Sequence, residues 1–440
     1  MKNSVRMAAA VAALALLGGC GIIKGGQKKT PTLGQRVPIL ASENDISADK
    51  SLIGVEVVLP APEANDGWTQ PGGNASKSMG HLALGQNLTR AWQVSIPGTN
   101  KRQRLAAAPV IADNRMFVAD TDGVIHAFAA DTGARLWEVS TVKGKENKAA
   151  RFGGGASAES GHVYATNGLG DVVALDASDG KELWRARPGG PLRGSPTVAN
   201  GQVYVVSQDN QLFALGEEKG DVLWTAPASL ESQGVFGVAA PASARGTVVA
   251  GFSSGELNAY RYENGNNLWA DVLSRSSIST SVSTLSDIDA EPVIDGNRVY
   301  AVGQGGRMVA MEINTGARMW EQNIAGIATP WVAGEWIFVV TDDARLLCIA
   351  RTSGKVRWIS QLHHFRNEKK KTNAIGWVGP VLAGNRLILF NTLGEIVSVS
   401  PTDGHVLGTI KDGGDLSESP VVAKNTLYVL DDKGRITAYR

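Results

Sequence analysis

Short apolar runs separated by polar turns recur along the chain from about residue 84 onward. In one copy the runs Gln202–Ser207 and Gln211–Leu215 are followed by a turn at Lys219-Gly220 and a further run ending at Trp224. Short runs between turn residues predict the strands of an antiparallel sheet. Both faces of most runs are apolar, as expected when neighbouring sheets cover each sheet on both sides.

Tryptophan marks the period of this pattern. Seven tryptophans recur at steps of 38 to 51 residues. Units of about 40–50 residues with four strands each are typical of propeller blades. We therefore interpret the tryptophan as structural, with one indole ring per blade packing between neighbouring sheets. The seven are Trp92, Trp137, Trp184, Trp224, Trp269, Trp320 and Trp358.

Two further landmarks count the blades. A proline or small residue opens eight apolar runs, and a glycine lies 24 residues after each of the first seven. The last start, Pro420, has only 20 residues after it, enough for three strands. The orphan run around Trp92 supplies the fourth, so the N- and C-terminal strands close the ring and remove its open edges. The starts are Pro109, Ala156, Pro196, Pro241, Pro292, Pro330, Pro380 and Pro420, and the glycines are Gly133, Gly180, Gly220, Gly265, Gly316, Gly354 and Gly404.

The pattern thus predicts an all-β fold, an eight-bladed β-propeller of four-stranded antiparallel blades over residues 81–440. All length variation falls between a tryptophan and the next start, where the chain crosses from one blade to the next. Such crossings share one face of the ring, so we expect interactions on that face. The longest crossings are Ala270–Glu291 and Ile359–Gly379, then Glu138–Gly155 and Thr225–Ala240.

The N-terminus has the pattern of an export signal. Lys2 and Arg6 precede an apolar run over 7–17, which is too short to cross a membrane. The run ends in Leu-Gly-Gly-Cys20, which resembles the lipobox of bacterial lipoproteins. We expect a signal peptide over 1–19 and acylation of Cys20; the alternative is an ordinary signal peptide with an incidental cysteine. By resemblance to enterobacterial sorting rules, Gly21 favours a lipid-anchored protein on the periplasmic face of the outer membrane.

The stretch that follows has no long periodic segment. It contains Gly25-Gly26, four prolines between Pro31 and Pro62, and Pro71. We therefore predict a flexible tether over residues 20–80, with one short strand at Ile53–Leu59.

Composition and charge exclude several classes of function. Lys and Arg total 43 and Asp and Glu total 42, so no basic excess indicates nucleic acid as a partner. Two cysteines form no disulfide framework, and Cys348 lies in an apolar run typical of a buried strand. The pair His363-His364 lies in a basic stretch with no further ligands at metal-site spacing, which favours a solvated loop. No catalytic residue, cofactor or metal ligand can be assigned.

The repeat resembles a known family. Its form, roughly A-x-P-V-V-x-x-G-x-V-Y-V followed by G-x-L-x-A-L-D-x-x-T-G-x-x-L-W, is best preserved at 131–137 and 176–184. It resembles the pyrroloquinoline-quinone (PQQ) type propeller repeat over about residues 68–440. Two functional classes share that repeat. One is the quinoprotein dehydrogenase, and the other is the propeller lipoprotein family of the outer-membrane β-barrel assembly machinery (BAM), which acts as a scaffold without enzymatic activity.

The scaffold class fits the sequence better. Quinoprotein alcohol dehydrogenases resemble one another in an adjacent cysteine pair and extra calcium-binding segments, and this chain has no Cys-Cys. The resemblance to the BAM propeller lipoproteins implies no cofactor. It implies a POTRA-containing barrel-forming protein as partner, unfolded outer-membrane proteins as clients and attachment to the membrane through a lipid anchor. A PQQ-dependent dehydrogenase or another periplasmic propeller scaffold remains the alternative.

A local match points to the partner surface. The segment Leu285-Ser286-Asp287-Ile288-Asp289 resembles an L-S-D-V-D segment of the BAM propeller lipoproteins, whose two aspartates lie on the surface that binds a POTRA domain. We expect Asp287 and Asp289 to be exposed carboxylates on a long crossing. The alternative is that both aspartates cap loop turns.

The second contact segment of that family lies one blade earlier and typically contains leucine and arginine. The aligned stretch here is Gln233–Gly237, with no arginine. The stretch keeps the family's position in a long crossing, but without the arginine its contact with a partner would differ chemically. We expect Val235, Phe236 and Gly237 to belong to the same partner surface.

Overall fold

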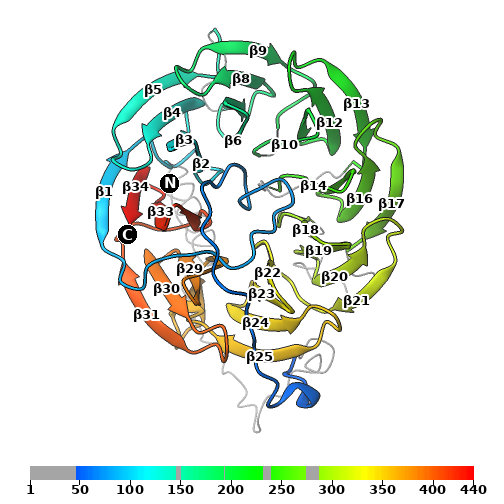
Figure 1. Cartoon of the computed structure of the whole chain (residues 1–440), viewed down its shortest axis with the longest axis vertical. Coiled ribbons are helices and arrows are strands. Elements are labelled where there is room, and N and C mark those ends of the chain that lie inside the picture. The colour runs from blue at the N-terminus through cyan, green and yellow to red at the C-terminus, as the bar shows by residue number, and fades with distance from the viewer. Residues whose placement is uncertain (1–45, 145–149, 193, 231–238, 274–286) are drawn as a thin grey trace, which may run out of the picture. The chain divides into compact units, whose positions relative to one another are not determined.

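The computed structural model describes residues 46–144, 150–192, 194–230, 239–273 and 287–440. From Ile46 to the C-terminus these form one compact unit. Eight sheets of four antiparallel strands surround a common axis (Figure 1). The predicted eight-bladed propeller is thereby confirmed. The described residues contain one short 3₁₀ helix, η1 (Lys50–Leu52), and no helix among them is long and apolar enough to cross a membrane.

Each blade begins with its innermost strand and ends with its outermost. Blades 1 to 4 consist of β2 (Val110–Ala112), β3 (Arg115–Ala119), β4 (Val124–Ala129) and β5 (Arg135–Ser140); β6 (Ala156–Glu159), β7 (His162–Thr166), β8 (Val172–Asp176) and β9 (Glu182–Ala186); β10 (Thr197–Ala199), β11 (Gln202–Val206), β12 (Gln211–Gly216) and β13 (Val222–Pro227); and β14 (Ala242–Ala244), β15 (Thr247–Gly251), β16 (Glu256–Arg261) and β17 (Asn267–Val272). Blades 5 to 8 consist of β18 (Val293–Asp295), β19 (Arg298–Gly303), β20 (Arg307–Glu312) and β21 (Arg318–Gln322); β22 (Trp331–Ala333), β23 (Trp336–Val340), β24 (Arg345–Ala350) and β25 (Val356–Gln361); β28 (Trp377–Ala383), β29 (Arg386–Asn391), β30 (Glu395–Val399) and β31 (Val406–Lys411); and β32 (Val421–Ala423), β33 (Thr426–Leu430) and β34 (Arg435–Tyr439) with β1 (Arg90–Ser95).

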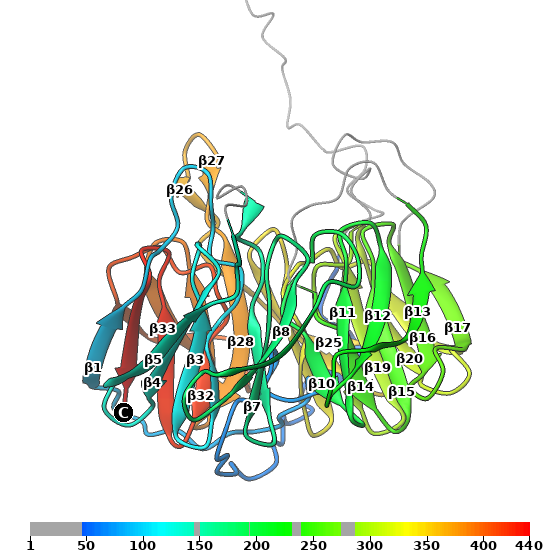
Figure 2. The same cartoon turned by 90° about the horizontal axis from the view of Figure 1, so that it is seen from above.

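The two faces of the ring are built from different connections. One face, here called the turn face, carries the tight turns between the first and second strands and between the third and fourth. The other, the crossing face, carries the segments that lead from the outermost strand of one blade to the innermost strand of the next. A hairpin of β26 (Phe365–Asn367) and β27 (Thr372–Ala374) projects from the crossing face between blades 6 and 7 (Figure 2).

The recurring tryptophan joins each blade to the next. Trp224 on β13 packs against Gly265 in the β16–β17 turn, where a Cβ would lie only 2.5 Å from the ring. Gly265 also has φ +70°, which an L side chain rarely adopts. The Nε1 of Trp224 donates to the carbonyl of Tyr262 in the same turn, at 2.8 Å. The same glycine contact recurs at Trp92–Gly133, Trp137–Gly180, Trp184–Gly220, Trp269–Gly316, Trp320–Gly354 and Trp358–Gly404.

This contact accounts for the constant spacing of the repeat. An insertion between the glycine and the tryptophan would shift the register of the outermost strand, where a bulge already sets the position of the ring. At the ring closure, β1 pairs with β34, and Trp92 rests on Gly133 of blade 1. The N- and C-terminal strands therefore close the ring as predicted.

Residues 46–80 do not form the flexible tether that the sequence predicted. Residues 46–59 run along the outside of blade 6, where the Asp49 amide donates to the carbonyl of Val356, and no strand forms over Ile53–Leu59. The chain then crosses the turn face of the ring as residues 63–84, here called the closing segment (Figures 1 and 2). The rest of the predicted tether, 20–45, and the signal over 1–19 lie outside the described residues.

The closing segment is hydrogen-bonded to the innermost strand of all eight blades. Its indole Trp68 stacks on Trp331 with centroids 6.1 Å apart, and both rings are buried. A segment with these contacts is part of the core, although it carries no periodic pattern. In blade order the pairs are Trp68 N with Ile111 O, Thr69 O with Ala158 N, Gln70 Nε2 with Val198 O, Ala75 O with Ser243 N, Ser76 O with Ile294 N, Gly80 O with Trp331 Nε1, Leu82 N with Leu382 O, and Asn65 Nδ2 with Val422 O.

Candidate partner-binding face

The crossing into blade 5 contains the described part of the predicted contact segment. Ile288 is fully buried, and its side chain occupies space that a Cβ at Gly251 of blade 4 would fill. Its amide donates to the carbonyl of Phe252 at 3.2 Å. This anchor draws the neighbouring residues into the ring, so the segment has one defined path on the crossing face.

The anchor changes the expectation for Asp287. Its exposed fraction is 1%, whereas the sequence predicted an exposed carboxylate. The Asp287 carbonyl accepts from the amide of Gln304, at 3.0 Å, in the β19–β20 turn. Asp289, on the other side of Ile288, is half-buried. The two aspartates are therefore not equivalent, since Asp287 is enclosed by the fold and Asp289 is partly open to solvent.

Two residues further on, the crossing meets the closing segment. Glu291 and Lys77 are both buried, and their charges attract one another inside the ring. The Nζ of Lys77 also donates to Thr197 Oγ1 of blade 3 at 3.2 Å. Burial lowers the pKa of Lys77 to about 8 and raises the pKa of Glu291, while each charge opposes the shift of the other. The pair ties the crossing face to the closing segment on the turn face.

The other predicted contact residues cannot be placed. Leu285 and Ser286, and Val235, Phe236 and Gly237, lie outside the described residues. The chain leaves blade 3 through Ser229, whose amide donates to Glu256 Oε2 of blade 4 at 2.7 Å. The next residue, Leu230, has an exposed fraction of 79%. An apolar side chain this exposed on the crossing face is a feature that sequence reasoning missed.

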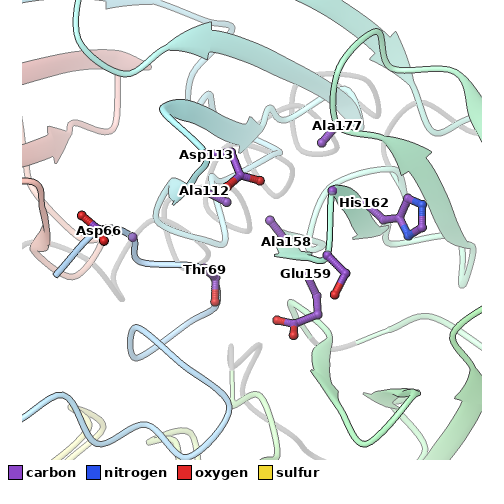
Figure 3. Close-up of a pocket in the computed structure, with 11 residues that line it drawn as sticks. Asp66, Thr69, Ala112, Asp113, Ala158, Glu159, His162 and Ala177 are labelled. Atoms are coloured by element: carbon purple, nitrogen blue, oxygen red, sulfur yellow. The ribbon is translucent and has the colours of Figure 1, made fainter.

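A pocket of about 190 Å³ lies on the turn face, between blades 1 and 2 and the closing segment. Asp113 and Glu159 stand on two sides of it, with Asp66 and His162 at its margin (Figure 3). Burial and the nearby Glu217 raise the pKa of Glu159. Among the described residues, no group of three or more His, Cys, Asp or Glu side chains is placed to hold a metal ion. The pocket is a recess lined by both apolar and polar atoms, and Asp66, Asp113 and Glu159 contribute carboxylates to its lining.

Two other residues from the sequence analysis have clear positions. Cys348 is a buried free thiol on β24, and burial raises its pKa, which disfavours the thiolate that a nucleophile requires. His363 lies at the base of the β26–β27 hairpin, 3.3 Å from the carboxylate of Glu368. Neither residue lies on the crossing into blade 5.

Comparison with known proteins adds the family context. The family profile described as outer membrane protein assembly factor BamB matches residues 89–152 and 121–360. The outer membrane protein assembly factor BamB of Yersinia pestis is 27% identical over 358 residues, which cover 80% of this chain and 88% of that protein.

Solved structures share the fold with this chain. The crystal structure of BamB from Moraxella catarrhalis matches with a TM-score of 0.67 at 17% identity, covering 80% of this chain and all of that one. Quinohemoprotein alcohol dehydrogenase from Comamonas testosteroni matches with a TM-score of 0.66 at 14% identity, covering 85% and 80%. At such identities the likeness concerns the fold alone, so the family profile and not the fold separates the two functional classes.

Proposed function

Because the chain belongs to the outer membrane protein assembly factor BamB family, we propose that its crossing face is the surface by which it joins the outer-membrane assembly complex. The chain is a scaffold of that assembly machinery and not an enzyme, as family membership implies. The dehydrogenase alternative shares the propeller and lacks this support.

Within the complex, we propose a periplasmic POTRA domain of the barrel-forming protein as the direct partner. The observation that carries this proposal is the inequality of the two faces. The closing segment occupies the turn face with bonds to all eight blades, whereas the crossing face presents Asp289 and the exposed Leu230. A surface with a partly exposed carboxylate and an exposed apolar side chain suits a protein partner.

The charge at Asp289 provides the test. Asp289→Arg should weaken binding to the purified POTRA region at least tenfold, equivalent to about 1.4 kcal/mol, because a like-charge contact replaces a complementary one. Isothermal titration calorimetry measures the affinity directly. The matched control is Asp221→Arg, an equal charge reversal at an exposed position of the β12–β13 turn on the other face.

The two variants separate the possible outcomes. Asp221→Arg should bind like the unaltered chain, and the melting temperature of each variant shows whether a loss of affinity comes from the contact or from folding. Equal affinity of Asp289→Arg and the unaltered chain would show that the partner binds elsewhere. Asp287 is unsuitable for charge reversal, because its burial would make Asp287→Arg a test of folding.

We further propose that Cys20 carries the lipid anchor and that residues 235–237 extend the contact surface. The lipobox pattern supports the first part, and the length of the crossing after blade 3 supports the second. The intact mass of the mature protein tests the anchor. Acyl mass on an N-terminal Cys20 is expected, and an unmodified N-terminus elsewhere would contradict it.

A further inference from the structure

The β26–β27 hairpin is a distinct projection on the crossing face. Phe365 pairs with Ala374 and Asn367 pairs with Thr372, so residues 368–371 form its tip (Figure 2). The sequence predicted only a solvated loop here. A hairpin of two short strands is marginal by itself, and its persistence therefore requires support from the blades at its base.

That support comes from two buried residues and three hydrogen bonds. Leu362 and Ile375, which flank the hairpin, are both buried in the core shared by blades 6 and 7. The Nε1 of Trp377 donates to the carbonyl of His363 at 2.9 Å, and the amide of Ile375 donates to the carbonyl of His364 at 2.8 Å. The amide of Gly376 donates to Thr392 Oγ1 at 3.1 Å. The tip is thus carried on a fixed base.

The tip concentrates positive charge that the fold does not neutralise. Lys369, Lys370 and Lys371 are consecutive and exposed, and none has a carboxylate within 4.0 Å in the part of the chain that the structure describes. The other charged groups of the hairpin are paired, since Glu368 lies 3.3 Å from His363 and Arg366 lies 3.6 Å from Asp415. Three adjacent like charges repel one another, so they add nothing to stability.

The path of the N-terminal residues relates this tip to the membrane. Asp49 is bonded to Val356 at the start of β25, and Ile46 packs with Ile359 against the same core cluster. Followed backward, the chain therefore runs along β25 toward the end that leads into the hairpin. Cys20 precedes Ile46 by 26 residues, which span at most about 86–94 Å when fully extended.

We propose that Lys369, Lys370 and Lys371 form a contact site for the anionic headgroups of membrane lipids. Lysine is a flexible point charge that suits a fluid anionic surface, whereas a protein partner is more often bound through arginine and aromatic anchors. The tip is also too small to form a stable protein interface. That the hairpin faces the membrane follows from the proposed lipid anchor, whereas binding of the lysines to anionic headgroups requires only the hairpin.

The contact would orient the propeller. A lipid anchor alone leaves the ring free to turn, whereas a second, electrostatic contact limits the faces that it can present. With the tip at the membrane surface, the crossing face is directed toward the membrane side. Because each basic residue near an anionic surface contributes about fivefold in affinity, three should contribute on the order of a hundredfold at low ionic strength.

The test uses the mature chain from residue 20 carrying Cys20→Ser, which has neither the apolar signal nor an acylated cysteine, so that the result is independent of the anchor. Its sedimentation with phosphatidylcholine vesicles is compared with that with vesicles containing phosphatidylglycerol. We expect salt-sensitive binding to the anionic vesicles only. The combined variant Lys369→Gln, Lys370→Gln and Lys371→Gln should bind them at least tenfold more weakly.

The matched control carries Lys181→Gln, Lys219→Gln and Lys424→Gln, three exposed lysines at tight turns of the turn face. It has the same net charge as the hairpin variant and should bind like the parent chain. Equal loss in both variants would show non-specific attraction and overturn the proposal. Absence of binding by the parent chain to anionic vesicles would also overturn the proposal. So would a hairpin variant that still binds these vesicles normally but no longer binds an acidic protein.

Discussion

The two faces of the ring differ in how their segments are held. On the turn face, residues 63–84 are bonded to the innermost strand of every blade, and Trp68 and Lys77 are buried among them. On the crossing face, the segments connect neighbouring blades, and Leu230 and the lysines of the β26–β27 hairpin are exposed. The turn face therefore stabilises the ring, while the crossing face has groups available for partners.

The contrast also explains why length varies on one face only. A turn between the third and fourth strands must keep its glycine against the tryptophan of the preceding blade, so no residue can be added there. A crossing needs only to connect two strand ends, and each doubling of its length costs about 0.6 kcal/mol of closure entropy. Sites of interaction can therefore be added on the crossing face with little loss of stability.

The largest expected effect is at the contact between blades. Trp224→Ala removes a buried ring and its hydrogen bond to Tyr262, and should lower the free energy of unfolding by about 3–5 kcal/mol. Chemical denaturation measures the change. The neighbouring Leu223 is exposed, and Leu223→Ala should change stability by less than about 0.5 kcal/mol. Similar losses in the two variants would contradict the role given to the tryptophan.

The closing segment should show the next largest effect. Lys77→Met leaves the buried Glu291 without its counter-charge, which should lower the free energy of unfolding by about 3 kcal/mol. Adding Glu291→Gln to that variant should restore part of the loss, because no buried charge then lacks a partner. Denaturation of both variants measures the coupling. If Lys77→Met were as stable as the unaltered chain, the closing segment would not be part of the core.

A substitution on the crossing face, at Glu418, should raise the free energy of unfolding, whereas the two preceding substitutions lower it. Burial, together with Asp432, raises the pKa of Glu418 to about 7 from 4.5. Between these values the folded chain keeps a proton that the unfolded chain has lost, so this carboxyl lowers stability as the pH rises through the window. Glu418→Gln should therefore raise the free energy of unfolding at pH 8 by about 1–3 kcal/mol and change it little at pH 4. A loss of stability at pH 8 would contradict the sign.

The blades could be predicted because their chemistry repeats. The tryptophan and its glycine partner appear once in each unit, and their constant spacing reports a contact that admits no insertion. Ring closure followed from the same count, since the run around Trp92 lacked three partner strands and Pro420 lacked one.

The closing segment could not be predicted in this way. Its bonds to the blades are mostly made by backbone groups, and its buried residues, such as Trp68 and Lys77, occur once and form no period. Its proline and glycines are typical of a tether, and burial of Lys77 depends on a distant carboxylate, Glu291. The burial of Asp287 was missed for a related reason, because the glycine that admits Ile288 lies on another blade.

Partners are expected to bind the crossing face and to leave the turn face as it is. Hydrogen–deuterium exchange of the chain, with and without a saturating POTRA fragment, distinguishes the two faces in one measurement. We expect slower exchange around residues 287–290 and near Leu230, with residues 63–84 unchanged. Slower exchange confined to residues 63–84, with the crossings unaffected, would contradict it.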